Sequence, residues 1–204
     1  MEYLNVAPVA SIIFVFTLVT SLYAFYDQSL YGKFMLHPYS VSKGHKVFTL
    51  ITSGLIHADW MHLFFNMFTF YAFAFTLEQM MGSWQFGLLY FLGLVLSDLP
   101  TVFKHKDDFH YNSLGASGAI SAVLFSYILF NPMSKIYIMF IPIGIPAVIF
   151  GGLYLVYCMY ASKNSRDNIN HDAHFFGALT GLIFTVIFVP NIIQHFIAAL
   201  SGGR

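Results

Sequence analysis

Residues 114–130 read LGASGAISAVLFSYILF, a group of small residues around Ser117 followed by a mainly apolar run. As a helix this run is roughly 25 Å long, which is short for a bilayer core of about 30 Å. If Asn131-Pro132 ends the helix at one membrane surface, its amino end stops below the other surface. We therefore expect Ser117 to lie submerged in the membrane, at the start of a helix.

The composition of the 204-residue chain is that of a membrane protein, because 58% of its residues are hydrophobic and only 9% are charged. A soluble domain carries about 25% charged residues. The formal net charge is zero and no basic run is present, which argues against a nucleic-acid partner. The single cysteine, Cys158, excludes an internal disulfide and a cysteine-rich metal site, and we expect it to be a buried packing residue.

Six apolar segments are candidates for membrane-spanning helices, given that about 20 residues cross a bilayer. They lie at residues 7–26, 56–80, 84–96, 114–130, 136–160 and 173–189. Backbone groups in lipid must be hydrogen-bonded within their own segment, so these segments are helices and not strands. Pro142, Gly144 and Pro146 interrupt the fifth segment, whose regular helix should begin near Pro146. The predicted fold is an all-α membrane protein, a six-transmembrane-helix bundle that forms one domain over residues 1–204.

Polar residues within these segments gather in three places. The second segment opens with HADWMHLFFN (residues 57–66), the fourth with LGASGAI (114–120) and the sixth with NHDAHFFGALTG (170–181). In a chain that crosses the membrane back and forth, alternate helices start on the same side. We therefore expect the three polar clusters to share one face and one depth. Polar groups at membrane depth are costly and often functional.

A serine becomes a nucleophile when a neighbouring base takes its proton, and His174 is a candidate for that base. Gly177 and Gly181 follow it as a G-x-x-x-G pattern, which lets a helix pack closely against a neighbour with small residues. The small residues around Ser117 provide such a neighbour. Close approach of the two helices would bring the Ser117 hydroxyl within reach of the His174 imidazole.

The tetrahedral intermediate of an acyl transfer also needs hydrogen-bond donors for its oxyanion. His62 and Asn66 are spaced i, i+4, so they share one helix face, and both side chains can donate. The N–H of Ser117, at a helix start, has no partner within the helix. His57 either orients this region or caps the second helix.

Two other polar positions receive structural interpretations. Glu78 lies roughly 24 Å beyond His62 along the second helix, at the opposite interface, and is expected to be structural. His171 and Asp172 are expected to be solvated loop ends.

Together the motifs resemble those of the rhomboid intramembrane serine proteases, and the resemblance covers nearly the whole chain, including the number and order of spans. The matching positions are the run Gly115–Gly118, the pair His174 and Gly177, and the trio His57, His62 and Asn66.

The resemblance implies a rhomboid-like bundle with a Ser117–His174 dyad and no acidic third member. It implies oxyanion contacts from His62, Asn66 and the Ser117 amide, in a cleft lined by Gly115 and Ala116. It also implies that the substrates are membrane-spanning proteins in the lipid bilayer and that no cofactor is needed. The oligomeric state stays open.

The chain departs from the family pattern at two places. Phe48-Thr49 stands where many rhomboids have a Trp-Arg pair in the first long loop. Ser121 stands where some members have a tyrosine that stacks on the catalytic histidine. Another aromatic residue, or none, must therefore restrain His174.

Two alternative functions are consistent with the same residues. The first is a metal-dependent membrane hydrolase, because imidazole suits zinc. Its ligands would be His57, His62, His171 and His174. The i, i+5 spacing of His57 and His62 is poor for chelation on one helix, and no H-E-x-x-H motif is present. The second alternative is a non-catalytic rhomboid-like protein that binds membrane proteins.

The orientation receives two opposed predictions. The resemblance implies a bacterial inner-membrane protein whose site opens away from the cytoplasm. Basic residues are more numerous in the loops on the side of the site, which by the positive-inside rule predicts a site facing the cytoplasm. The basic residues on that side are Lys33, Lys43, Lys46, Lys104, Lys106, Lys163 and Arg166, against Lys135 and Arg204 on the other.

Overall fold

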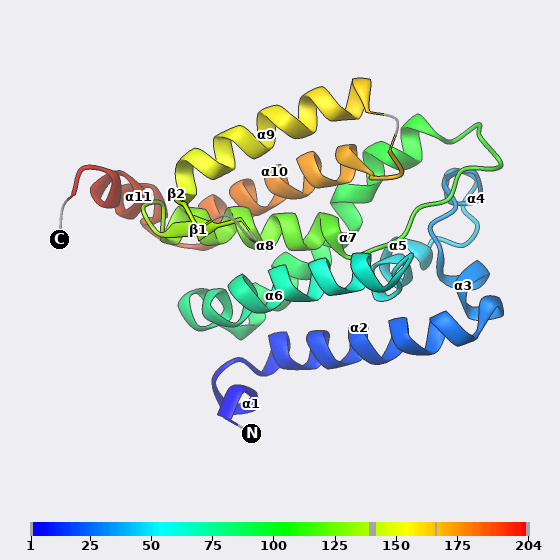
Figure 1. The fold of residues 1–204 in the computed structure, drawn as a ribbon, viewed down its shortest axis with the longest axis horizontal. Coiled ribbons are helices and arrows are strands. Elements are labelled where there is room, and N and C mark those ends of the chain that lie inside the picture. Colours follow the sequence, from blue (N-terminus) through cyan, green and yellow to red (C-terminus); the bar gives the residue numbers. More distant parts are fainter. Residues whose placement is uncertain (1, 139–141, 166, 203–204) are drawn as a thin grey trace.

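The computed structural model describes residues 2–138, 142–165 and 167–202, which fold mainly into helices (Figure 1). In chain order the helices are α1 (Glu2–Val6), α2 (Pro8–Tyr26), α3 (Gln28–Phe34), α4 (Pro38–Ser42), α5 (Thr49–Thr52), the 3-10 turn η1 (Ser53–Leu55), α6 (Trp60–Met81), α7 (Ser83–Lys104), α8 (Ser117–Phe130), α9 (Ala147–Asn164), α10 (His171–Phe188) and α11 (Ile192–Leu200). Residues 139–141 of the expected fifth span, and the counted basic residues Arg166 and Arg204, lie outside the described residues.

The long helices lie side by side in one bundle, with α2 at one edge and α9 at the other (Figure 1). Helix α8 lies in the middle, in contact with α6, α7 and α10. Most residues of α8 are buried on every side of the helix, as expected for an apolar helix without a polar face. The start of this helix, where Ser117 lies, is therefore held by neighbours on several sides.

Three of the described helices are long and apolar enough to cross a membrane, namely α2, α7 and α10, and α8 is a shorter apolar helix of 14 residues. The prediction of a helical membrane protein is confirmed. The count of six spans, which also needs α6, α8 and α9, stays a prediction.

Helix α7 differs from the expected span at 84–96, because it continues to Lys104. The prediction ended the span where Ser97 and Asp98 interrupt the apolar run. In the structure Ser97 is buried and Asp98 lines an internal cavity, so neither side chain has to face lipid. The helix therefore continues through them.

The expected fifth span, 136–160, also differs, because its first part holds a small hairpin. Strands β1 (Lys135–Tyr137) and β2 (Gly144–Pro146) pair antiparallel, with Ile136 opposite Ile145. This hairpin was not predicted and is the exception to an all-α fold. The prediction that the helix begins near Pro146 is confirmed, since Pro146 is the N-cap residue of α9.

Helices α8 and α10 touch through their backbones. A methyl group added at Gly177 would collide with the carbonyl oxygen of Gly118, and one added at Gly181 would collide with that of Ala122. Further along, the hydroxyls of Ser126 and Thr185 are hydrogen-bonded at 2.6 Å between the same two helices. The G-x-x-x-G prediction is confirmed, and this contact sets how close the two polar helix ends can come.

Glu78 has the structural role that was predicted. Its carboxylate, at 1% exposure, accepts the backbone N–H groups of Val9 at 3.1 Å and Ala10 at 2.6 Å, in the first turn of α2. These N–H groups have no partner within the helix, and a carboxylate there also complements the helix dipole. The side chain therefore ties α6 to α2 at the end of the bundle away from Ser117.

Replacing Glu78 by alanine should destabilise the protein by about 3 kcal/mol, since hydrogen bonds to charged groups contribute about 1.5–3 kcal/mol each. The measurement is thermal or denaturant unfolding in detergent. Glu78→Gln, which keeps one acceptor oxygen, should fall between the alanine variant and the unaltered protein. Equal stability of all three would show that these hydrogen bonds do not hold α2.

Candidate active site

A cavity of about 900 Å³ lies at the amino ends of α6, α8 and α10. Figure 1 shows these three ends at the same end of the bundle. The cavity is lined by members of all three predicted clusters, including His62, Asn66, Gly115, Ser117 and His174. The structure thus brings together the clusters that the alternation of spans had placed on one face.

Ser117 is the first residue of α8 and is half-buried. The first backbone hydrogen bond of this helix runs from the N–H of Ile120 to the oxygen of Ala116 at 3.0 Å. The N–H of Ser117 precedes that bond, as expected for a free donor at a helix start. The preceding Gly115 has φ +116°, a conformation that side chains disfavour, and its N–H donates to the Ser53 carbonyl at 2.9 Å. This turn delivers the Ser117 hydroxyl to the cavity.

His62 is oriented so that one ring nitrogen is a donor. Its Nδ1 accepts the N–H of Ala58 at 3.3 Å, which leaves the proton of the neutral ring on Nε2. That nitrogen faces the turn before Ser117, because a methyl group added at Gly115 would lie 2.7 Å from it. A second candidate donor is the side-chain nitrogen of Asn66, which is buried and, among the described residues, has no hydrogen-bond partner.

His57 does not cap α6, because the carboxylate of Asp59 accepts the N–H of His62 at 2.8 Å in that position. His57 is buried, and its Nδ1 is hydrogen-bonded to the Ser21 hydroxyl of α2 at 2.9 Å. Its ring packs edge-on against that of His62, with 4.9 Å between centroids. His57 is thus hydrogen-bonded to α2 and packed against His62.

The first long loop is attached without the Trp-Arg pair. Phe48 is exposed, and the Thr49 hydroxyl only donates within the loop, to the Lys46 carbonyl. One attachment of the loop is made by Leu36 and Ser113, whose backbones exchange hydrogen bonds of 2.9 and 3.0 Å. This bridge joins the loop to the segment that leads into Ser117.

His174 lies in the first turns of α10, next to the start of α8. A methyl group at Gly118 would lie 3.4 Å from the carbonyl oxygen of Ala173, so the residues adjacent to Ser117 and His174 are neighbours. The start of α10 is fixed by Asn170, whose side chain accepts the N–H of Ala173 at 3.1 Å and donates to Thr101 of α7 at 2.9 Å.

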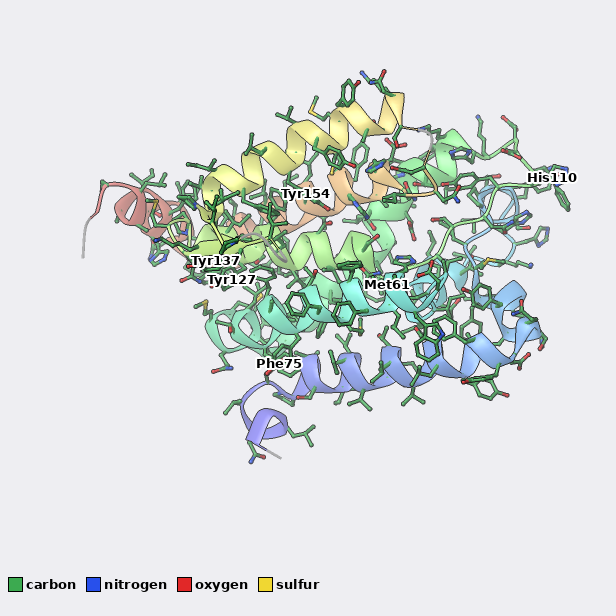
Figure 2. All side chains as sticks on the ribbon, viewed as in Figure 1. Met61, Phe75, His110, Tyr127, Tyr137 and Tyr154 are labelled. Atoms are coloured by element: carbon green, nitrogen blue, oxygen red, sulfur yellow. The ribbon has the colours of Figure 1, made fainter. Side chains whose placement is uncertain are left out.

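An aromatic ring does lie beside His174, and it comes from α9. The ring of Tyr154 lies nearly parallel to the imidazole, with 6.2 Å between centroids and an interplanar angle of 15°. The Tyr154 hydroxyl is hydrogen-bonded at 3.1 Å to Ser121, the residue found in place of the family tyrosine. Figure 2 shows Tyr154 between α9 and α10. Sequence alone could not find it, since nothing in the sequence links residues 154 and 174.

The expectation that His171 is a solvated loop end is wrong. Its side chain is buried because α9 covers it, with Tyr157 packed edge-on against the ring at 5.4 Å. Asp172 does lie at the rim of the cavity, in an ion pair of 2.5 Å with Lys104.

The four histidines of the metal-hydrolase alternative do not form one ligand set. Within the described ranges, the one group of three or more candidate ligands with donor atoms inside 4.8 Å consists of Cys158, His171 and His174. His57 and His62 lie outside this group.

Polar residues near the end of α7 also line the cavity, although the predicted span ended at residue 96. One of them, Asp98, is a carboxylate within an otherwise apolar run. A charged residue in such a run is often functional, and this signal could have pointed to Asp98. His105 stacks on Tyr111 with 3.6 Å between ring centroids. Burial, and next the charge of Lys104, lower the pKa of His105, which favours a neutral ring at the mouth of the cavity.

The fold and the cavity define the class of protein. It is a helical membrane protein in which a serine, histidines and an asparagine line one cavity at the amino ends of three helices. A sequence model of the Rhomboid domain matches residues 44–191. The chain belongs to the rhomboid family.

Curated relatives agree with this assignment. The chain is 26% identical over 170 residues to the mitochondrial RHOMBOID-like protein 12 of Arabidopsis thaliana, covering 74% of this chain and 50% of that protein. It is 30% identical over 151 residues to the rhomboid YdcA of Bacillus subtilis, covering 70% and 67%. A mitochondrial presenilin-associated rhomboid-like protein of Danio rerio is 28% identical over 144 residues, with 65% and 35% covered. The chain thus spans from about a third to about two thirds of the length of these three relatives.

Proposed function

We propose that the chain is an intramembrane serine endopeptidase in which Ser117 is the nucleophile and His174 the general base. The observation that carries this proposal is that both residues line one cavity at the touching ends of α8 and α10. The Ser117 oxygen attacks the scissile carbonyl carbon while its proton passes to His174. When the intermediate collapses, the C–N bond breaks and His174 returns the proton to the leaving amine. Water then releases the acyl group from Ser117 by the reverse sequence.

The oxyanion of each intermediate would be held by three donors. These are Nε2 of His62, the side-chain amide of Asn66 and the N–H of Ser117. The orientation of His62 and the unpaired amide of Asn66 support these roles. Each such donor is worth about 2.7–4 kcal/mol in known acyl-transfer sites. Gly115 lines the cavity next to Ser117. The expectation that Ala116 lines the cleft with it is wrong, because Ala116 is fully buried and does not line the cavity.

The substrates would be membrane-spanning segments of other proteins. Helical amides are shielded and already hydrogen-bonded, so the segment has to unwind before its carbonyl reaches Ser117. Residues of low helix propensity near the cleaved bond would ease the unwinding.

Cleavage of a single-span protein in proteoliposomes tests the activity. The purified chain should cut the substrate within or next to its span, and cleavage should continue in the presence of EDTA. A complete loss of cleavage with EDTA would support a metal-dependent hydrolase. Binding of the substrate without turnover would support a non-catalytic binder.

For the location, we propose a bacterial inner membrane with the cavity on the extracytoplasmic side. The family resemblance supports this orientation, whereas the distribution of basic residues supports the opposite one. Reporter fusions after α11, a helix that lies at the other end of the bundle from the cavity (Figure 1), should report a cytoplasmic end. An extracytoplasmic signal would reverse the orientation.

Tyr154 is expected to position His174, so removing its ring should slow the reaction. Tyr154→Ala should lower kcat by about 10- to 100-fold, within the range that misplaced catalytic groups produce, with a smaller effect on KM. Tyr154→Phe keeps the ring and loses the hydrogen bond to Ser121, and should cost less than tenfold. Ser121→Ala is the matched control for that hydrogen bond. Equal kcat for Tyr154→Ala and Tyr154→Phe would exclude a role for the ring.

A further inference from the structure

Three soft or borderline metal ligands lie together on the side of His174 that faces α9. They are the thiol of Cys158 and the imidazoles of His171 and His174, whose donor atoms all lie within 4.8 Å of one another. The two histidines are spaced i, i+3, so they share one face of α10, and Cys158 meets them from α9. Cys158 and His171 are buried, and His174 is half-buried. This cluster is separate from the pair His57 and His62.

A carboxylate determines which ring nitrogen of His171 carries the proton, as in metal-binding histidines. Its Nε2 contacts the Asp167 carboxylate at 3.1 and 3.2 Å, so the neutral ring carries its proton there and donates it. Nδ1 then carries no proton and has a free lone pair. In the described part of the chain this buried atom has no hydrogen-bond partner. A histidine that ligates a metal almost always donates its other N–H to a carboxylate or carbonyl in this way. The unpaired Nδ1 is thus an independent sign of a ligand.

The donor set selects the metal. One thiolate and two imidazoles suit Zn²⁺, which takes three protein ligands and an open fourth position in many sites. Around a tetrahedral zinc, with Zn–N about 2.0 Å and Zn–S about 2.3 Å, ligand atoms lie about 3.3–3.5 Å apart. This spacing falls inside the 4.8 Å within which the three donor atoms lie. The cavity that His171 and His174 line would admit the ion and the fourth ligand, a water molecule.

We propose that Cys158, His171 and His174 form an inhibitory Zn²⁺ site. The Cys158 thiol loses its proton to the solvent on binding, and each imidazole gives a lone pair to the metal. A His174 bound to zinc no longer accepts the Ser117 proton, so metal binding stops peptide hydrolysis reversibly. The binding site stands on its geometry alone, whereas the inhibition rests on the proposed function.

Metal binding is measured first, without reference to activity. Purified protein in detergent is titrated with Zn²⁺ by calorimetry and with Co²⁺ by visible absorption, in which thiolate ligation gives a charge-transfer band. We expect one tight site per chain, weakened at least 100-fold in Cys158→Ala and in His171→Ala. Asp167→Asn alters the support of His171 and keeps an acceptor oxygen for the N–H of Ile169, and it should weaken binding by about 10- to 100-fold.

The control is His45→Ala, which removes an exposed histidine far from this cluster in the sequence and should bind zinc as the unaltered protein does. Ser117→Ala should also keep the site. Absence of a thiolate–cobalt band, or equal affinity in Cys158→Ala and the unaltered protein, would overturn the proposal.

Inhibition is measured second, with each variant compared with its own rate in EDTA. Zinc should suppress cleavage by the unaltered protein more than tenfold, EDTA should restore it, and Cys158→Ala should resist zinc. Equal inhibition of both would refute regulation through this site. If no substrate is cleaved under any condition while the metal-binding pattern holds, the proposed function fails and the zinc site stands.

Discussion

Replacing Ser117 by alanine should abolish cleavage of a transmembrane substrate, lowering kcat by about 10⁴-fold or more. The variant keeps the cavity, the donors of His62 and Asn66 and the base, but it has no oxygen to attack the carbonyl. Removal of a nucleophile leaves only the rate that oxyanion stabilisation and binding provide. The substitution removes one oxygen atom at a half-buried position, so unfolding temperature in detergent should change little.

The matched control is Ser134→Ala, beyond the opposite end of α8, where the hydroxyl only donates to the Asn131 carbonyl. It should cleave at the normal rate. A Ser117→Ala protein that still cleaves at more than one hundredth of the normal rate would exclude Ser117 as the nucleophile.

Replacing Gly177 by valine should have the largest effect on the fold. The added atoms would meet the backbone of Gly118, which cannot rotate away as a side chain could. The start of α8 must then separate from α10, which moves Ser117 away from His174. We expect a loss of stability of about 3 kcal/mol together with a loss of cleavage, measured by unfolding in detergent and by turnover.

Gly152→Val is the control for the helix propensity of valine. Gly152 also lies within a helix, α9, but among the described residues no neighbouring atom stands within 4 Å of the position that a Cβ would take. This variant should be as stable as the unaltered protein. Equal unfolding temperatures for the two valine variants would contradict the close contact between α8 and α10.

Much of the site could be predicted because its parts have local signals. GASG before an apolar run, AHFFG at a helix start and His62 with Asn66 on one face each stand out in sequence. Their meeting follows from the alternation of helices, and the cavity contains residues of all three. The close contact of α8 and α10 could also be predicted, because Gly177 and Gly181 allow the two backbones to touch.

The parts that could not be predicted depend on contacts between distant residues. Tyr154 of α9 lies beside His174, whereas some rhomboids have a tyrosine for this at the position of Ser121 on α8. Only the packing of α9 on α10 reveals this neighbour. The same packing buries His171 and adds Cys158 to the neighbourhood of His174. Helix α7 extends beyond its predicted end because Asp98 faces a cavity. Hydropathy cannot distinguish a polar residue that lines a cavity from one in a solvent-exposed loop.

The most direct test of the proposed dyad is the site of covalent labelling by a fluorophosphonate, read by peptide mass spectrometry. The account predicts one adduct, on the peptide that contains Ser117, with loss of labelling in His174→Ala and with labelling retained in Ser134→Ala. An adduct on another serine, or undiminished cleavage after complete labelling of Ser117, would contradict it.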